Sequence, residues 1–522
     1  MTIRDAVLLL VAGFFLAGSI LFFPFTVDDA FIVARYAVNA RDLREWAFNA
    51  GEHVSALTSP LHGLLMIGLS WMGDPVPVYK VVSVLTVAAA SAIAVRRYGL
   101  DRPEAPLVAV VVVAPGMLLW TAAGLETPIL MAIVTAMATV YATGSPGDPR
   151  PVVTLGILAG AAVLTRYDAV LFAGPVLLAA IVTAPFRYAL SATAVAAMPV
   201  LAWFVYSSMR FGSILPTSFF VKMPTGALDV IAVNVRYMAE QLAIDGVAIV
   251  AAYVAARLIV SGRAGAALLD EFRTRGGLHI ALAAVLTYGA TMATVHMMFA
   301  FRHFVPYLGA AAIALAYVAR RADGPDNRPN PATSSWATVC ALMILTLHAF
   351  QAHALYYHSL QGLGTRGEYE AQGAAGYARD FVPAMQRNAA DVRAHWAALK
   401  RGRQPRVWTF AAGALPYAYR DAYIFEELVS YRHLCPLEEG SERSDGRVWR
   451  AHADYIHAFT RHGSPGRLVS PVRLQDLQLI SEEPIHFNGR DEKLLVFFNP
   501  APQPNLLPSR IDLPCAADAG GD

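Results

Sequence analysis

The chain has 522 residues, of which 56% are hydrophobic and only 15% are charged. Soluble globular proteins usually carry about 25% charged residues, so this composition excludes an ordinary soluble enzyme. The net charge of +2 is too small to indicate a nucleic-acid-binding protein. Of the 80 charged residues, 39 fall in positions 356–522. The sequence therefore predicts a membrane domain over 1–355 and a soluble domain over 356–522.

The first apolar run covers residues 6–24 and is long enough to cross roughly 30 Å of hydrocarbon. A cleaved signal peptide is the alternative, but no A-x-A site follows the run and many further apolar runs do. Together with the first, these runs predict a polytopic helical protein with about eleven transmembrane helices. The further runs are 76–95, 104–120, 126–143, 151–164, 168–184, 188–208, 244–261, 278–298, 303–319 and 334–353.

The most basic connections between these runs are 96–103, 262–275 and 320–328. Basic connections usually face the cytoplasm, so eleven crossings place the chain after residue 354 on the opposite side. The shorter run 59–73 would reverse everything after it if it crossed fully. We therefore expect a partial or re-entrant segment there.

The first outer loop, 25–58, begins with two adjacent carboxylates, Asp28 and Asp29. A charge at the end of a span is costly unless it is paired or hydrated. A helix over 28–41 would align Asp28, Arg35 and Asn39 on one face. The simpler interpretation is a helix cap made by one aspartate. The second aspartate and the polar residues that follow favour a binding site instead; its candidate substrate contacts are Arg35, Tyr36, Asn39, Asn49, Glu52, Thr58 and Ser59.

Further polar residues fall at the same outer rim. Each alone is typical of a snorkelling or helix-end side chain, but their arrival on one side indicates a shared pocket. A hydrated basic pocket beside lipid suits a phosphate on a lipid tail, because arginine binds oxyanions well. Carboxylates in such a pocket can act as a general base. The rim residues are Glu126, Arg166, Asp168, Lys222, His296, Arg302 and His303.

The C-terminal region predicts a small α/β domain. A helical connection over 356–400 precedes a strand and turn within 407–419, and helical periodicity follows in 424–434. Later strands are expected at 467–474, 477–487 and 493–498. The domain could cap the site, or could bind carbohydrate through the aromatic residues Trp408, Tyr417, Tyr419 and Tyr423.

The chain has three cysteines. Cys340 lies in an apolar run, where we expect it to be packed. Cys435 and Cys515 both fall in the outer domain, in an oxidising compartment under this topology. A disulfide between them is left open, because the sequence does not show how far apart they lie.

Two segments of the first loop, DDAFIVARYAVNA at 28–40 and FNAGEHVSALTSPL at 48–61, resemble the signature of a branch of GT-C membrane glycosyltransferases. That branch includes the mycobacterial terminal arabinofuranosyltransferases and the pilin arabinosyltransferases of some pseudomonads. This chain has His62 where the family usually has an aromatic residue, and Arg166-Tyr167-Asp168 where Arg-Pro-Asp or Arg-Pro-Glu is common. Further segments match in the family's order: 124–128, 165–168, 211–222, 296–307 and 412–430.

The resemblance implies a glycosyltransferase of the bacterial inner membrane that uses a polyprenyl-phosphate sugar and has its C-terminal domain on the extracytoplasmic side. Asp28 or Asp29 would deprotonate an acceptor hydroxyl, which would attack the anomeric carbon with inversion. The lipid phosphate that leaves would be held by Lys222, Arg302, His303 and Arg166.

The same resemblance favours arabinofuranose as the sugar and a glycan, a lipid-linked glycan or a pilin as the acceptor. No cofactor is required, although the Asp pair and Glu126 could hold a divalent ion such as Mg or Mn. A hexose or aminosugar transferase acting on lipopolysaccharide or protein is the nearest alternative. A flippase or transporter of polyprenyl-linked sugars is another class, but the internal repeats common in transporters are not evident. A non-enzymatic envelope scaffold would leave the Asp pair unexplained.

Overall fold

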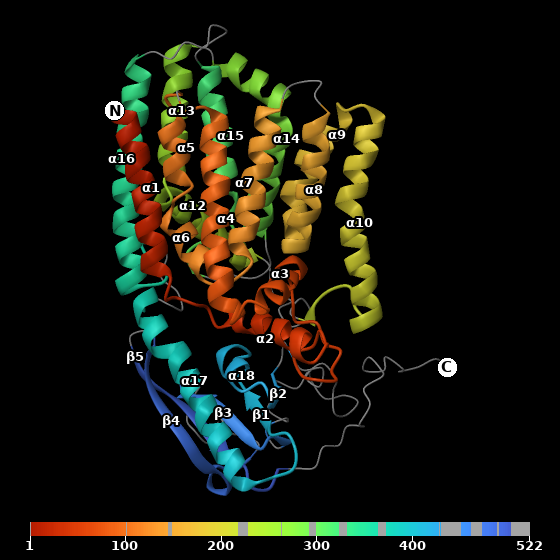
Figure 1. The fold of residues 1–522 in the computed structure, drawn as a ribbon. Coiled ribbons are helices and arrows are strands. Elements are labelled where there is room, and N and C mark those ends of the chain that lie inside the picture. Colours follow the sequence, from red (N-terminus) through yellow and green to blue (C-terminus); the bar gives the residue numbers. More distant parts are fainter. Residues whose placement is uncertain are drawn as a thin grey trace.

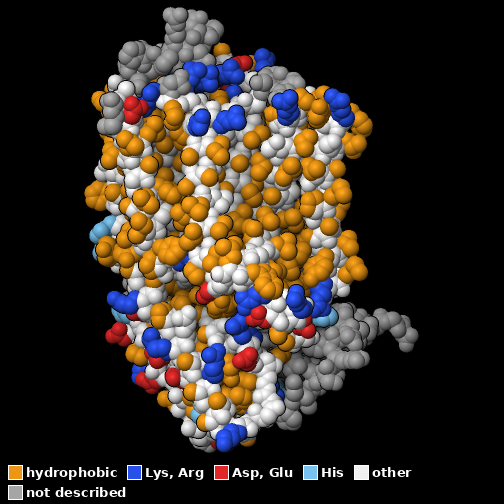
Figure 2. Space-filling view, viewed as in Figure 1, with side chains coloured by type: hydrophobic (Ala, Val, Ile, Leu, Met, Phe, Trp, Pro, Cys, Tyr) orange, Lys and Arg blue, Asp and Glu red, His pale blue; other side chains and the backbone are white. Residues whose placement is uncertain are grey.

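The computed structural model describes residues 2–100, 102–144, 149–217, 228–262, 264–291, 299–322, 331–363, 372–426, 429, 450, 452–460, 472–487 and 490–502. A bundle of helices stands above a smaller domain that contains a sheet (Figure 1). A band of hydrophobic side chains covers the bundle, and charged side chains gather at its two edges and over the smaller domain (Figure 2).

Four helical segments among the described residues are long and apolar enough to cross a membrane: α1 (Ile3–Phe22), α4 (Pro75–Tyr98), α10 (Phe186–Phe211) and Ser335–His358, which includes most of α16 (Pro331–His353). Two bent helix pairs, described below, raise this number to six. The predicted number of eleven spans stays a prediction. The rest of the bundle is formed by α7 (Thr127–Thr143), α8 (Arg150–Thr165), α9 (Val170–Val182), α14 (Ala264–Thr291) and α15 (Leu308–Arg321).

Each of the two bends has a local cause. α5 (Ala105–Val111) and α6 (Pro115–Ala122) meet at 46°, and proline at the first position of α6 cannot continue the hydrogen bonding of α5. α12 (Leu228–Ile244) and α13 (Val247–Ser261) bend by 74° at Gly246, whose φ of +79° is readily adopted by glycine. A Cβ there would also lie 2.5 Å from the side chain of Ile344.

Two short helices lie between the bundle and the smaller domain (Figure 1). α2 (Asp29–Asp42) confirms the helix expected over 28–41. α3 (Pro60–Ser70) has eleven residues and is about 16 Å long at 1.5 Å per residue, too short to cross a bilayer. This length agrees with the partial segment expected over 59–73.

The basic connections meet at the end of the bundle away from the sheet domain. The guanidinium of Arg275 lies 3.8 Å from the ring centroid of Tyr317, and that of Arg320 lies 6.0 Å from it. Arg275 also pairs with Glu271 at 2.8 Å, and Arg321 pairs with the same carboxylate at 3.3 Å. Connections far apart in sequence therefore form one charged layer.

The C-terminal domain packs α17 (Ala374–Leu399) on a five-stranded sheet of order β2-β1-β3-β5-β4. β1 (Arg406–Thr409) is parallel to β2 (Tyr423–Phe425) and to β3 (Tyr455–Phe459), and β5 (Arg490–Phe498) is antiparallel to β3 and β4 (Gln478–Phe487).

The strands predicted at 477–487 and 493–498 are confirmed, as are the strand and turn after 406. The helical connection predicted over 356–400 is confirmed over 374–399, whereas 359–363 are not helical. The strand predicted at 467–474 is wrong in its described part, because 474–476 form a 3₁₀ helix. The helical pattern expected from residue 424 is also wrong there, since 424–425 belong to β2. Cys340 packs against the core as expected, whereas Cys435 and Cys515 lie outside the described residues.

Candidate functional site

Asp28 joins the first loop to the C-terminal domain. Its two carboxylate oxygens accept hydrogen bonds from the backbone N–H groups of Gly413, at 3.1 Å, and Ala414, at 2.8 Å, at the start of α18 (Ala414–Ala418). Only glycine fits at 413, because a Cβ there would lie 2.0 Å from the backbone oxygen of Asp28. Burial raises the pKa of Asp28 to about 7 although both hydrogen bonds favour the ionised form.

Arg35 contacts the other end of the same short helix. Its five N–H groups, which are all that a guanidinium has, donate to backbone carbonyls, and the side chain is 1% exposed. An acid at the N-terminus and a base at the C-terminal carbonyls of α18 both match the helix dipole. The shared face predicted for 28 and 35 is therefore confirmed. The acceptors of Arg35 are the carbonyls of Phe48, Pro416, Tyr419, Arg420 and Ala422.

Two more predicted contacts tie the loop to β2. The Asn49 amide donates to the carbonyl of Ile424 and accepts from its N–H, both at 2.9 Å, as a neighbouring strand would. Glu52 accepts a hydrogen bond from the hydroxyl of Tyr423 and another from Asn49. These side chains hold the C-terminal domain against the first loop.

Asn39 and Tyr36 organise the loop itself. Nδ2 of Asn39 donates to the carbonyls of residues 47–48. The hydroxyl of Tyr36 donates to the carbonyl of Val54 at 2.7 Å and accepts from the N–H of Ala56 at 3.1 Å. Both residues, predicted as substrate contacts, are buried and bonded to backbone.

Asp29 differs from its neighbour. Across the part of the chain that the structure describes, no residue hydrogen-bonds or ion-pairs with its carboxylate. Asp29 and Tyr36 are seven residues apart on α2, so they lie on the same face of that helix. Because Tyr36 bonds to residues 54 and 56, this face is directed toward 54–56 and not toward α18. The structure therefore separates one bonded aspartate from one that is available.

Five rim residues from distant stretches meet in one partly buried cluster around Glu126. Arg166 donates to Glu126 at 3.2 Å and to both oxygens of Asp168 at 3.0 and 2.8 Å. Arg302 donates to both oxygens of Glu126 at 3.1 and 3.3 Å, and His303 Nδ1 lies 3.0 Å from Arg166. Burial would raise the pKa of Glu126, but Arg302 and Arg166 outweigh it and hold that pKa at about 2.

The aspartates and the cluster belong to one region. The N–H of Val27 donates to the carbonyl of Ala123 at 3.1 Å. Gly124, with φ of +86°, lies so close to α2 that a Cβ would be 2.9 Å from the side chain of Ala30. Glu126 follows two residues later. Of the other predicted site residues, Thr58 is exposed, Ser59 is buried, and Lys222 and His296 lie outside the described residues.

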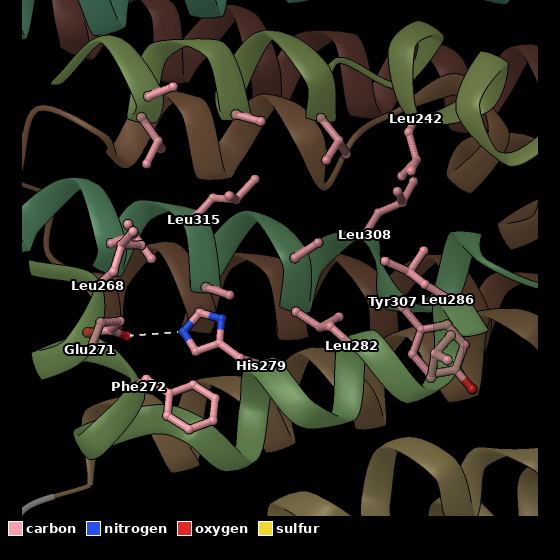
Figure 3. Close-up of a pocket in the computed structure, with 18 of the residues that line it drawn as sticks. Leu242, Leu268, Glu271, Phe272, His279, Leu282, Leu286, Tyr307, Leu308 and Leu315 are labelled. Atoms are coloured by element: carbon pink, nitrogen blue, oxygen red, sulfur yellow. Dashed lines mark ion pairs between the residues drawn. The ribbon is translucent and has the colours of Figure 1, made fainter. Parts of the chain in front are cut away.

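An apolar cavity of about 860 Å³ adjoins the cluster. It lies between α13, α14 and α15, and its lining includes Phe301, Phe304 and Tyr307, from the segment that carries Arg302 and His303. Tyr307 lies toward one end, and Glu271 and His279, which are 3.7 Å apart, lie toward the other (Figure 3). The remaining lining residues are apolar.

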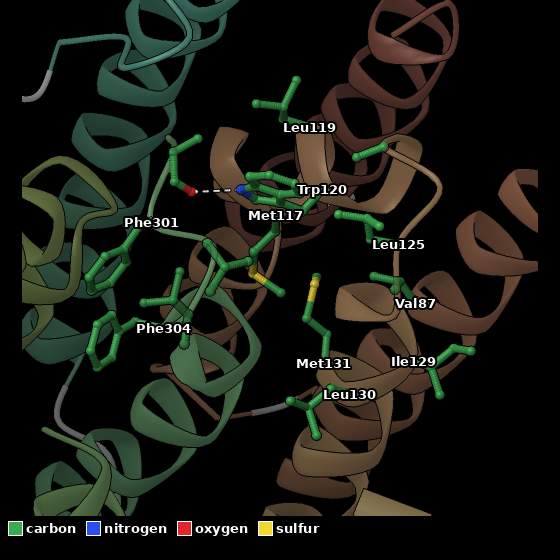
Figure 4. Packing of buried hydrophobic residues seen from close by; sticks show 14 of the residues in the cluster. Val87, Met117, Leu119, Trp120, Leu125, Ile129, Leu130, Met131, Phe301 and Phe304 are labelled. Carbon is green, nitrogen blue, oxygen red and sulfur yellow. Dashed lines mark hydrogen bonds between the residues drawn. The ribbon is translucent and has the colours of Figure 1, made fainter. Parts of the chain in front are cut away.

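A strained turn joins cavity and cluster. Ala300 and Phe301 adopt φ of +47° and +57°, a left-handed conformation that costs roughly 1–2 kcal/mol for each non-glycine residue. Trp120 Nε1 donates to the carbonyl of Ala300 at 3.0 Å (Figure 4), and the N–H of Phe301 donates to the hydroxyl of Tyr237 at 2.8 Å. These bonds fix a turn that leads directly into Arg302.

Lys80 is a rim residue that the sequence analysis missed. Its ammonium donates to the backbone oxygens of Phe23 and Phe25 and to the hydroxyl of Thr26, so it fixes the chain just before the aspartates. It lies within the apolar run 76–95, which the analysis treated as a span. A single charge inside such a run is the signal that could have found it.

Two of the three carboxylates proposed for a divalent ion, Asp28 and Glu126, are already bonded, whereas Asp29 is not, so the ion stays a prediction. Both oxygens of Glu126 accept from Arg302, and both oxygens of Asp28 accept from backbone N–H groups. Within the described ranges, no group of three or more His, Cys, Asp or Glu side chains could hold a metal.

The aromatic residues predicted as stacking groups are also engaged. Tyr417 donates to Asp74 at 3.0 Å, Tyr423 donates to Glu52, and Trp408 and Tyr419 are buried. Of the two uses left open for the C-terminal domain, these contacts favour a cap.

No protein-family model and no curated protein match the chain. Among solved structures, ArnT from Cupriavidus metallidurans in the apo state has a TM-score of 0.56 at 15% identity, over 95% of this chain and 99% of that one. ArnT bound to undecaprenyl phosphate has a TM-score of 0.53 at 13% identity, over 96% and 98%. An Archaeoglobus fulgidus oligosaccharyltransferase reaches only 0.45 at 11% identity, over 87% and 69%. The chain therefore has the ArnT fold over nearly its full length and is a multi-pass membrane protein, which confirms the predicted helical architecture with a C-terminal sheet domain.

Proposed function

We propose that this protein is a glycosyltransferase of the bacterial inner membrane that transfers arabinofuranose from a polyprenyl phosphate to an extracytoplasmic glycan, lipid-linked glycan or pilin. One observation carries the proposal: residues 301–307 supply part of the wall of the apolar cavity and also Arg302 and His303 of the charged cluster. A polyprenyl phosphate needs this combination, because an anion must be bound next to a long apolar chain. ArnT, which shares the fold, has been solved with undecaprenyl phosphate bound.

Asp29 is the general base in this proposal. It takes the proton of the acceptor hydroxyl while that oxygen attacks the anomeric carbon, and the electrons of the broken C–O bond leave with the lipid phosphate. One such displacement inverts the anomeric carbon. A carboxylate beside the reacting carbon also stabilises its developing positive charge.

The leaving phosphate is bound by Arg166 and Arg302, which Glu126 and Asp168 hold in place. These two carboxylates balance the two guanidinium groups, so the phosphate requires further positive charge. We assign that charge to Lys222, while His303, whose Nδ1 accepts from the guanidinium of Arg166, contributes an N–H donor through its other ring nitrogen. Asp28 positions the cap rather than reacting, since both its oxygens are bonded to the C-terminal domain.

Comparing Asp29→Asn with Asp28→Asn tests these roles. The assay uses purified protein in vesicles with decaprenyl-phosphate arabinofuranose and an oligosaccharide acceptor, and it follows both release of decaprenyl phosphate and labelling of the acceptor. Loss of a general base should lower turnover by roughly 10²–10⁴-fold in Asp29→Asn. Asp28→Asn should keep measurable turnover but melt at a lower temperature.

Near-normal turnover in Asp29→Asn would exclude it as the base. Donors carrying hexoses or aminosugars in the same assay distinguish the alternative transferase. If the wild type moves the labelled lipid across the vesicle membrane without cleaving it, the protein is a flippase and the proposal is wrong.

A further inference from the structure

Four side chains near Glu126 carry buried polar atoms without a hydrogen-bond partner among the described residues. The atoms are Oγ of Ser59, both ring nitrogens of His62, Oγ1 of Thr127 and Nε of Arg302, and none of them bonds to any residue that the structure describes. His62 is 0% exposed, Ser59 3% and Thr127 1%. Leaving such a group unsatisfied costs about 1–3 kcal/mol, and native proteins contain few of them. Five such atoms lie together at this one place, which is typical of a site that binds a polar ligand.

Contacts place these groups together. Ser59 is the N-cap residue of α3 and His62 lies one turn further, but the serine hydroxyl makes no capping bond. The ring of His62 lies 4.4 Å from that of Tyr79, whose hydroxyl donates to the carbonyl of Leu125 at 2.8 Å. The next residue is Glu126. Thr127 follows Glu126 directly in the chain, and Arg302 pairs with the carboxylate of Glu126.

Arg302 can only donate, but the chemistry of Ser59, His62 and Thr127 matches hydroxyls rather than another phosphate. Burial lowers the pKa of His62 to about 4, so its imidazole is neutral and offers one donor and one acceptor. The hydroxyls of Ser59 and Thr127 can also both donate and accept. A sugar hydroxyl has the same dual capacity, whereas a phosphate oxygen only accepts.

We propose that Ser59, His62 and Thr127 form the subsite that binds the hydroxyl groups of the donor sugar, with His62 as the specificity-determining residue. The inference rests on the proposed function. The subsite lies on the side of α2 that carries the proposed base. α2 packs on α3, and the face of α2 with Asp29 is directed toward 54–56, which come just before Ser59 in the chain. A sugar lacking the bound hydroxyl would leave these groups unpaired, and sites of this kind discriminate strongly against such analogues.

The test compares His62→Phe, His62→Gln and the control Leu64→Ala, an exposed position on the same helix. The probes are decaprenyl-phosphate arabinofuranose and its monodeoxy analogues. Donor affinity is measured by tryptophan fluorescence, and kcat and KM by transfer. His62→Phe should lose roughly 10–100-fold in kcat/KM for the full donor, mainly through KM, which corresponds to the loss of one or two well-formed hydrogen bonds. His62→Gln should retain more than His62→Phe, because its amide still donates and accepts.

Two readouts separate binding from structure. His62→Phe should melt at a higher temperature than the wild type, because it removes two unsatisfied buried nitrogens, whereas a residue needed only for packing would melt lower. One deoxy donor should also be used equally well by His62→Phe and by the wild type. If the wild type transfers sugar but all three variants match it on every donor, the inference is wrong and the proposed function stands. If the wild type neither binds nor transfers any of these donors, both are wrong.

Discussion

Replacing Gly413 with alanine should release the C-terminal domain from the first loop. The new Cβ would lie 2.0 Å from the backbone oxygen of Asp28 and 2.4–2.5 Å from its carboxyl group, whereas non-bonded atoms rest near 3.5 Å. Relieving this overlap must lengthen the bonds of 3.1 and 2.8 Å that Gly413 and Ala414 donate to Asp28. Each bond contributes about 0.5–1.5 kcal/mol when Asp28 is neutral and about 1.5–3 kcal/mol when it is charged, so we expect the docked state to lose roughly 1–6 kcal/mol.

The matched control is Gly402→Ala, in the same domain, where a Cβ would meet no atom within 4 Å. Docking is measured by limited proteolysis and by amide hydrogen exchange of 412–425 in purified protein, together with sugar transfer. Gly413→Ala should expose 412–425 to exchange and lower transfer at least tenfold, while Gly402→Ala should behave like the wild type. Equal exchange and transfer in the two variants would refute the account of the Asp28 contact.

Three further predictions concern the charged groups. Glu126→Ala should destabilise the protein by about 3–5 kcal/mol, because it removes the carboxylate of Arg302 and leaves Arg166 with Asp168 alone, and Glu126→Gln should cost less. Thermal melting of both variants tests this, and an unchanged melting temperature for Glu126→Ala would contradict it. Arg35→Lys should weaken the contact of the C-terminal domain with the first loop, since an ammonium has three donors whereas the guanidinium uses five. Faster amide hydrogen exchange of 416–422 is the expected result, and an unchanged exchange rate would contradict it. The pKa of Asp28 is raised on folding to about 7, so its contribution to stability is complete below about pH 4 and is lost as the pH rises through 7; melting curves from pH 5 to 8 should show this fall in the wild type and not in Asp28→Asn.

The helical periodicity and charge of the first loop predicted its structure well. A period of 3.6 residues placed Asp28 and Arg35 on one face of α2, and both do contact α18. The sequence could not show what that face would meet, because the partner lies some 385 residues later in the chain. The sequence therefore predicted Arg35 as a substrate contact. In the structure all its N–H groups donate to backbone carbonyls instead.

Short elements limited prediction in the C-terminal domain. β2 has only three residues, too few for an alternating pattern to stand out from the helical periodicity that follows it. The longer strands β4 and β5 carried a clear signal and were predicted. At the rim, Glu126 and Arg302 were identified from their charge, whereas Lys80 was hidden within an apolar run.

Asp28 bonds to one end of α18 and Arg35 to the other, so the first loop and the C-terminal domain depend on each other's sequence. An exchange of residues 372–502 alone between two such enzymes would bring a new α18 to an old Asp28, Arg35 and Asn49, and its carbonyls and glycine would have to match by chance. Grafts that also carry residues 25–58 would keep every partner. Engineered chimaeras, and natural recombination between relatives, should therefore tolerate the paired exchange far better than either half alone.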